Sequence, residues 1–295
     1  MTTRVLLAGA GTPGHRQDHH RDMYGPAVQG LEGFEQAETL DDADLVIICA
    51  DVNKPDELAD LLQRSADAGK PAVVDKPTLL PTAVLADLAA RFPNAVAAHH
   101  PRFHPAMTTA RGRAVSGGLG LLHAVHGELL VGPGDGPHPL GELRNLAVYA
   151  LDVVQSLIGD LHGRAHAVIA QAGPDGSGEA ITLSLRCRPD VAVSLLIGRA
   201  GPGAGEANAV PDNSILHRYR ILGSHGQLLV DLDSPAFDVI GTHRGRLPFG
   251  PSSVDSLIRS VADGGTRPGL GIAADLAAVI DALNTSAATH RAVDF

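Results

Sequence analysis

The chain has 295 residues, of which 33 are acidic and 23 basic, so its formal net charge at pH 7 is −10 with the histidines neutral. A protein that neutralises nucleic-acid phosphates needs a basic surface, so this balance argues against DNA or RNA as a partner. Hydrophobic residues make up 44% of the chain and charged residues 19%, which favours a folded chain with one large or two medium domains over a disordered one.

The sequence predicts neither a membrane span nor a secretory signal. No uninterrupted apolar stretch approaches the roughly 20 residues that cross a bilayer, and the start, MTTRVLLAGAG, runs directly into a strand pattern. We therefore expect a cytoplasmic protein. Two cysteines, Cys49 and Cys187, make neither a disulfide framework nor a thiolate metal site, and we expect buried, reduced thiols.

The first hundred residues alternate between short apolar runs and helical patterns. The runs cover residues 4–10, 44–50, 71–77 and 94–99. Short continuous apolar strands that alternate with helices predict a parallel sheet covered on both faces. We assign residues 1–100 to a Rossmann-like dinucleotide-binding domain.

A glycine-rich turn follows the first apolar run. Residues 9–14 read GAGTPG and match G-x-G-x-x-G in front of a helical pattern, which is typical of a turn that cradles a pyrophosphate, although a plain structural turn is the alternative. Later runs end at the same carboxyl edge, where open α/β sheets bind ligands. The predicted cofactor-binding residues are Gly9, Gly11, Thr12, Pro13, Gly14, Ala50, Asp51, Asp75 and Lys76.

The adenosine half of this fingerprint is incomplete. A dinucleotide fold supplies an acidic residue about 20 residues after the glycines, at the end of a second strand. Glu32 and Glu35 fall near that distance, but only ten residues separate Glu35 from Val46 in the next clear strand. We expect the second strand and its helix to be abbreviated or absent, and the choice between NAD and NADP stays open.

Beyond Arg102 strand-like segments follow one another without helices between them. They cover residues 121–131, 163–171, 179–187, 190–198 and 217–232, with helical patterns at 142–158, 253–264 and 271–287. Consecutive strands without helices prefer antiparallel pairing. We assign residues 101–295 to an α+β domain with a large open antiparallel sheet, and we expect the Gly- and Pro-rich segments 132–141 and 199–213 to be loops that set substrate specificity.

The helix at 142–158 carries one polar stripe formed by Asn145, Tyr149, Asp152 and Ser156. Because the rest of its circumference is apolar, the stripe faces either a cleft or, in the simpler interpretation, ordinary solvent. Tyr149 is the best acid on the stripe and would need a neighbouring cation, such as Lys76, to exchange protons near neutral pH. Histidines 99, 100, 104 and 138 fit no known zinc spacing, and we expect no metal.

In order and spacing, the chain resembles the Gfo/Idh/MocA oxidoreductase family. The segments that carry the resemblance are GAGTPG (9–14), AGKPAVVDKP (68–77), HPRFHP (100–105), NLAVYALDVVQSLIG (145–159), RILGSHGQLLVD (220–231) and the terminal run from residue 256. The resemblance implies that Lys76 takes the place of the Glu-Lys-Pro lysine. It puts Asn145 and Tyr149 in the places of an Asp-x-x-x-His pair, with a tyrosine as in glucose-fructose oxidoreductase and dihydrodiol dehydrogenase.

The function that this resemblance implies is hydride transfer between NAD or NADP and a secondary alcohol or ketone of a sugar-like or other small metabolite. Tyr149 would exchange the proton, Lys76 would polarise the oxygen and Asn145 would orient the substrate. We also expect a homodimer or homotetramer formed through the antiparallel sheet. Two alternatives stay open: a catalytically silent relative that serves as a partner or stabilising subunit, and a non-redox elimination or isomerisation enzyme.

Overall fold

The computed structural model describes residues 2–11, 18–131, 138–172, 178–187, 190–199, 215–232, 237–239, 245–247, 253–265 and 268–295. The chain forms two compact units. Unit 1 comprises Met1–Phe103 and Pro251–Ala277, and unit 2 comprises His104–Gly250 and Ala278–Phe295. The first boundary lies close to the expected one, but the sequence prediction assigned 251–277 to the second domain. That segment joins unit 1 because Leu257, Ile258 and Val261 pack into its core.

Unit 1 is built on a five-stranded parallel sheet in the order β2-β1-β3-β4-β5. Its strands are β1 (Thr3–Gly9), β2 (Phe34–Ala37), β3 (Leu45–Cys49), β4 (Ala72–Val74) and β5 (Val96–Ala97). Every residue of β3 and β4 is buried, as parallel strands with both faces covered require. The predicted Rossmann-like architecture is confirmed.

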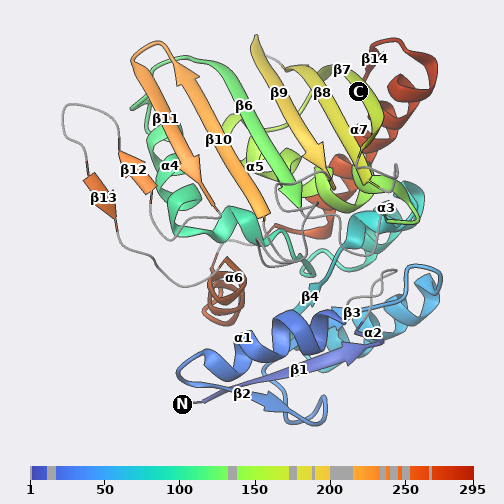
Figure 1. Cartoon of the computed structure of the whole chain (residues 1–295). Helices are drawn as coiled ribbons and strands as arrows, with labels where there is room; N and C mark the ends of the chain where they lie inside the picture. Colours follow the sequence, from blue (N-terminus) through green and yellow to red (C-terminus); the bar gives the residue numbers. More distant parts are fainter. Residues whose placement is uncertain are drawn as a thin grey trace, which may run out of the picture. The chain divides into compact units, whose positions relative to one another are not determined.

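Helices cover both faces of this sheet (Figure 1). One face packs against α2 (Pro55–Asp67), α3 (Thr82–Arg91) and the start of α7 (Leu270–Thr289). The other packs against η1 (His20–Tyr24), α1 (Gly25–Gly30) and α6 (Ser253–Ala262). Along β3, Val46 and Ile48 point into the first core and Leu45 and Ile47 into the second, the alternation that a pleated strand imposes. Two short 3-10 helices, η2 (Pro77–Leu79) and η3 (His100–Phe103), complete the unit.

The second strand is abbreviated and the helix after it is absent. The four residues of β2 pair in parallel with β1, in register from Thr3 opposite Phe34. Residues 38–44 between β2 and β3 contain only turns and bends. The sequence therefore correctly indicated a shortened first domain, and the structure shows that the strand itself is kept at the edge of the sheet.

Unit 2 contains a seven-stranded sheet in the order β11-β10-β6-β9-β8-β7-β14 (Figure 1). Its strands are β6 (Leu122–Val131), β7 (Gly163–Ala172), β8 (Gly178–Cys187), β9 (Val191–Gly198), β10 (Ile215–Gly223), β11 (Gly226–Asp231) and β14 (Val293–Asp294). All neighbouring pairs are antiparallel except β6 and β9, which run parallel. A separate two-stranded sheet joins β12 (Phe237–Val239) to β13 (Gly245–Leu247).

Helices pack against one face of this sheet. They are α4 (Pro105–Val115), η4 (Leu143–Ala147), α5 (Val148–Ile158) and the last part of α7. On β6 the side chains of Val125 and Leu129 point into this core, whereas His126 and Glu128 are exposed on the opposite face. Both cysteines are buried and free, as expected. The predicted α+β domain is confirmed in fold class.

By length and composition alone, α7 is apolar enough to cross a membrane, and it is the one such helix in the described ranges. Leu270, Ala273 and Ala277 of α7 lie in a core of unit 1. Further along, Ser286 Oγ accepts a hydrogen bond from the backbone N–H of Ala167 on β7. These contacts are those of the core helix of a folded domain, and a single helix of this kind is weak evidence for a membrane.

Candidate functional site

The glycine turn at the end of β1 has the geometry that its motif predicts. Gly9 and Gly11 have φ angles of +91° and +78°, in the left-handed region that favours glycine. A Cβ atom on Gly9 would lie 2.3 Å from the carbonyl oxygen of Cys49 on the neighbouring strand. Glycine is therefore required for β1 to end against β3. Thr12, Pro13 and Gly14 lie outside the described residues.

The side chain of Asp18 fills the space beside Gly11. Its Oδ1 lies 2.6 Å from where a Cβ atom on Gly11 would be, and the same oxygen accepts a hydrogen bond of 3.0 Å from the backbone N–H of Arg21. The N–H of His19 donates to the carbonyl of Gly11, at 2.6 Å. In dinucleotide-binding folds the space beside such a glycine admits the pyrophosphate. Here the carboxylate of Asp18 lies beside Gly11.

Asp18 comes shortly before the first helical element that the structure describes. That element, η1, starts at His20, and Asp18 itself is not helical. Its side chain accepts a hydrogen bond from the backbone N–H of Arg21. An acidic side chain therefore precedes η1.

An acidic residue stands at the end of the shortened second strand. Glu38 directly follows Ala37, the last residue of β2, and is exposed. The residue at this position holds the adenosine ribose in dinucleotide-binding folds. The spacing in the sequence indicated Glu32 and Glu35 instead, but Glu35 lies inside β2 and its Oε1 accepts a hydrogen bond of 2.8 Å from Arg4 Nε. Only the observed end of the strand singles out Glu38.

The ends of β3 and β4 lie along the same edge of the sheet as the glycine turn. Gly9 pairs with Cys49, so Ala50 and Asp51 directly follow the strand beside the turn. Asp51 Oδ1 accepts hydrogen bonds from the backbone N–H and the Nδ2 of Asn53, at 2.9 and 3.0 Å. This side chain therefore stabilises its own turn, which leaves the backbone of Ala50 and Asp51 to line the edge.

Lys76 follows β4 in a strained backbone conformation. Its φ and ψ angles are 43° and 48°, the left-handed region, and a proline comes next. A residue other than glycine costs about 1–2 kcal/mol in this region, and proline further restricts the residue before it. Such strain persists where the surrounding structure holds it, often at functional sites. The backbone of Lys76 therefore supports the functional role that the resemblance implies.

Asp75 makes its contacts inside unit 1. Its side chain is fully buried and accepts hydrogen bonds from His19 Nδ1 at 2.5 Å and from the hydroxyl of Tyr24 at 2.8 Å. Burial alone would raise the pKa of this carboxyl, but the bonds from His19 and Tyr24 and the charge of Lys76 outweigh it, and the pKa is lowered. We predicted Asp75 as a cofactor-binding residue. In the structure its carboxylate accepts hydrogen bonds from two side chains of unit 1.

The polar stripe of the helix at 142–158 is buried. The exposed fractions of Asn145, Tyr149 and Asp152 are 1%, 8% and 0%, and Ser156 Oγ, partly exposed, donates to the carbonyl of Val153. The interpretation of this stripe as an ordinary wet face is therefore wrong. Burial and the charge of Asp152 raise the pKa of Tyr219 on β10, which shows that Asp152 faces the sheet of unit 2.

Asn145 serves as a donor to a buried carboxylate. Its Nδ2 donates to Glu142 Oε2 at 2.7 Å, and the Glu142 side chain has no exposed surface. The other carboxylate oxygen of Glu142 accepts from Arg199 Nε at 2.6 Å and from the N–H of His138 at 2.8 Å. An aspartate at position 145 would bring a second carboxylate against Glu142. This pair gives a physical reason for asparagine at the position where the resemblance expects aspartate.

The predicted catalytic residues belong to different units. Lys76 lies in unit 1, whereas Asn145 and Tyr149 lie in unit 2. Most of the two predicted specificity loops, residues 132–137 and 200–213, falls outside the described residues. Where the chain is described, no group of three or more His, Cys, Asp and Glu side chains is arranged to hold a metal ion.

Comparison with known proteins finds solved structures with the same architecture. No protein-family model and no curated protein matches the chain. A putative myo-inositol dehydrogenase from Sinorhizobium meliloti superposes with a TM-score of 0.75 at 16% identity, covering 99% of each chain. A myo-inositol dehydrogenase from Corynebacterium glutamicum gives 0.74 at 14%, covering 100% of this chain and 99% of the other. Levoglucosan dehydrogenase in complex with NADH gives 0.72 at 17%, with the same coverage.

The chain has the fold of these dehydrogenases. The likeness extends over the full length of both chains, so the Rossmann-like unit and the open-sheet unit are both included. At 14–17% identity it shows the fold alone. The resemblance of the sequence to Gfo/Idh/MocA oxidoreductases is thereby confirmed at the level of architecture.

The residues at the sheet edge fit a dinucleotide with one exception. Gly9 and Gly11 have the required conformation, and Glu38 stands at the ribose position. The exception is Asp18, because a pyrophosphate beside Gly11 would have to replace its carboxylate. The edge thus has the backbone of a dinucleotide fold, with an acidic side chain beside Gly11.

Replacing Asn145 with aspartate should destabilise unit 2. The new carboxylate would lose the bond to Glu142 and repel it in a buried setting, at a cost of about 2–4 kcal/mol. Adding Glu142→Gln to Asn145→Asp restores a donor, so the double variant should be more stable than the sum of the single changes by at least about 1 kcal/mol. Urea denaturation of the four chains measures this coupling. Strict additivity would show that the Asn145–Glu142 bond contributes nothing.

Proposed function

We propose that the protein is a nicotinamide-dependent oxidoreductase that interconverts a secondary alcohol and a ketone on a sugar-like or other small metabolite. The observation that carries the proposal is Lys76, held in a left-handed conformation at the carboxyl edge of the parallel sheet that also bears the Gly9–Gly11 turn. Solved structures of the same fold include complexes with NAD or NADH. They support the choice of a nicotinamide cofactor.

The cofactor would lie along the carboxyl edge of unit 1. Gly9 and Gly11 would admit its pyrophosphate and the backbone of Ala50 and Asp51 would line its path. The carboxylate of Glu38 would accept hydrogen bonds from the adenosine ribose, and it would repel a 2′-phosphate. We therefore propose NAD over NADP.

Two side chains, those of Lys76 and Tyr149, would act on the reacting oxygen of the substrate. The ammonium of Lys76 would donate to that oxygen and stabilise negative charge on it. The phenol of Tyr149 would exchange a proton with it. When bound, the nicotinamide accepts or supplies the hydride at the carbinol carbon. On oxidation the alcohol loses that hydride and its hydroxyl proton and becomes a ketone.

A purified full-length chain should bind NADH and oxidise it with a ketose or related ketone. Tyr149→Phe and Lys76→Met should each lower kcat by about 10²–10⁴-fold, because each removes a group that acts on the substrate oxygen. The absorbance of reduced nicotinamide measures turnover, and Ser156→Ala on the same helix is the matched control. Wild-type rates in Tyr149→Phe would remove the phenol from the mechanism. Product formation without net cofactor consumption would instead favour an elimination or isomerisation.

A second candidate function is supported by Asp18. A carboxylate at the phosphate position, together with the shortened adenosine half, is what a catalytically silent relative would carry. Such a chain would keep the fold and act as a partner or stabilising subunit. The two candidates differ in whether unit 1 takes up a dinucleotide.

Removing the charge of Asp18 should strengthen dinucleotide binding. In Asp18→Asn the repulsion between the carboxylate and a pyrophosphate disappears, and the dissociation constant for NADH should fall by at least about tenfold. Asp22→Asn is the matched control, since Asp22 lies four residues further on, in η1, and pairs with Arg21 on the surface. Calorimetric titration of NADH into the three chains measures the difference. If none of them binds NADH, the silent relative is favoured.

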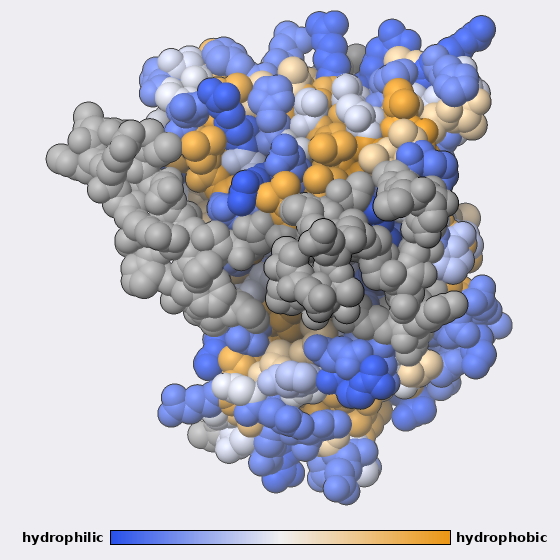
Figure 2. Space-filling view, in the orientation of Figure 1, coloured by the Kyte–Doolittle hydropathy of each residue, from blue (hydrophilic) through white to orange (hydrophobic). Residues whose placement is uncertain are grey.

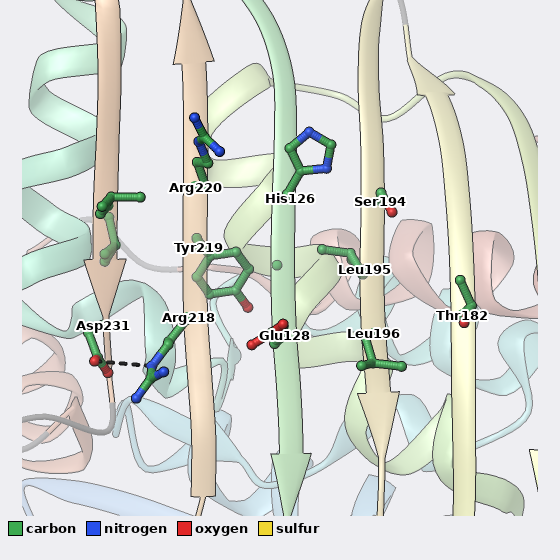
Figure 3. A pocket seen from close by; sticks show the side chains of 13 residues that line it. His126, Glu128, Thr182, Ser194, Leu195, Leu196, Arg218, Tyr219, Arg220 and Asp231 are labelled. Carbon is green, nitrogen blue, oxygen red and sulfur yellow. Dashed lines mark hydrogen bonds and ion pairs between the residues drawn. The ribbon is translucent and has the colours of Figure 1, made fainter. Parts of the chain in front are cut away.

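We also propose that a second copy of the chain covers the outer face of the seven-stranded sheet. No element that the structure describes packs on this face, which bears a hollow of about 530 Å³. Figure 2 shows apolar and polar side chains side by side over it. Figure 3 shows Arg218 paired with Asp231, at 3.2 Å, and Glu128 on a neighbouring strand. A face that carries both charges and exposed apolar residues can complement itself across a two-fold axis.

Introducing glutamate at two exposed apolar residues of this face should prevent self-association. Val168 and Leu229 are 52% and 39% exposed, and replacing both with glutamate places uncompensated charges where the copies would meet. Light scattering should then give the mass of one chain instead of two or four. Val115→Glu, at a residue on α4 that is 72% exposed, is the control and should leave the assembly intact. A monomeric wild-type chain would refute the interface.

A further inference from the structure

His19 and Asp75 form a pair at the carboxyl edge of the parallel sheet. His19 lies beside the end of β1, because its backbone N–H donates to the carbonyl of Gly11 at 2.6 Å. Asp75 directly follows β4 and precedes Lys76. The imidazole Nδ1 and the carboxylate Oδ2 are 2.5 Å apart. The pair thus joins the glycine turn to the strand that carries the candidate catalytic lysine.

The bond to Asp75 fixes which nitrogen of His19 carries the proton. The lowered pKa of Asp75 keeps the carboxylate ionised, and an ionised carboxylate can only accept hydrogen bonds. Nδ1 must therefore be the donor. In the neutral imidazole the lone pair then lies on Nε2. The hydroxyl of Tyr24 donates to the other oxygen of Asp75 at 2.8 Å, so both oxygens are held in place.

Nε2 of His19 has a different environment from Nδ1. The side chain is 7% exposed, and the hydrogen bond that the structure shows for this ring, among the described residues, is the one at Nδ1. Burial lowers the pKa of nearby His100 to about 4, so that ring stays neutral and adds no competing positive charge. A mostly buried imidazole, oriented by a carboxylate and presenting one lone pair, is suited to proton transfer.

We propose that His19 is an acid–base residue that unit 1 contributes to the reaction, with Asp75 as its positioning residue. The inference rests on the oxidoreductase function proposed above. During alcohol oxidation the hydride leaves the carbinol carbon for the nicotinamide, the phenol of Tyr149 exchanges the proton of the hydroxyl, and Nε2 of His19 is the final acceptor of that proton. In ketone reduction the same nitrogen returns the proton. Asn145 cannot titrate, whereas the His19–Asp75 pair contains an ionisable imidazole.

The tautomer of His19 can be measured without any turnover. In the full-length chain labelled with ¹⁵N-histidine, the His19 signals are those lost in His19→Gln. We expect a protonated Nδ1 and an unprotonated Nε2, and we expect Asp75→Asn to abolish this preference. If Asp75→Asn does not fold, Tyr24→Phe serves as the second variant, because it removes one donor from Asp75 and should alter the Nδ1 resonance. A proton on Nε2 in the neutral ring would overturn the assignment.

Kinetics test the chemical role of His19. We expect His19→Ala to lower kcat by at least about 100-fold with little change in the KM for NADH, because proton transfer is lost and cofactor binding is kept. Added imidazole should restore activity by at least about tenfold, which a merely structural role would not allow. His123→Ala, at an exposed histidine of unit 2, is the control and should behave as wild type.

The outcomes separate this inference from the proposed function. A wild-type chain without turnover counts against the oxidoreductase, and the tautomer measurement then decides whether His19 is held as an acid–base group. Turnover that survives in His19→Ala, or a loss that imidazole does not repair, overturns the role of His19 and leaves the oxidoreductase standing.

Discussion

The carboxylate of Asp75 is the constraint on which the candidate site of unit 1 depends. A buried charge is tolerated only when hydrogen-bond donors surround it. Here donors come from His19, just before η1, and from Tyr24, its last residue. The carboxylate follows β4, so these bonds fix the helical segment after the glycine turn against the strand that precedes Lys76. The carboxylate of Asp75 therefore helps to position the glycine turn, the imidazole of His19 and the backbone of Lys76.

Unit 2 uses a second buried carboxylate in the same way. Glu142 gathers Asn145, Arg199 and the N–H of His138 around the start of the helix that carries Tyr149. His138 and Arg199 belong to the two segments predicted to set specificity, 132–141 and 199–213. In each unit the candidate residues are thus held by a carboxylate in the interior of that unit.

The sequence predicted the architecture well because the architecture depends on local patterns. The alternation of apolar runs and helices indicated the parallel sheet, and the ten residues between Glu35 and Val46 indicated the shortened first domain. Contacts between distant residues gave no such signal. His19 and Asp75 are 56 positions apart, and Asp18 meets Gly11 across a stretch that the motif treats as helix. The return of Pro251–Ala277 to unit 1 also depends on core packing, since an amphipathic helix does not specify which core it joins.

The left-handed backbone of Lys76 has a consequence for how this position could evolve. Glycine and asparagine adopt such a conformation at little cost, whereas β-branched residues oppose it. Neutral drift away from lysine should therefore run through those two residues, and the turn between β4 and η2 would persist after the ammonium was gone. A descendant without the lysine would still show a left-handed residue at this place in its main chain.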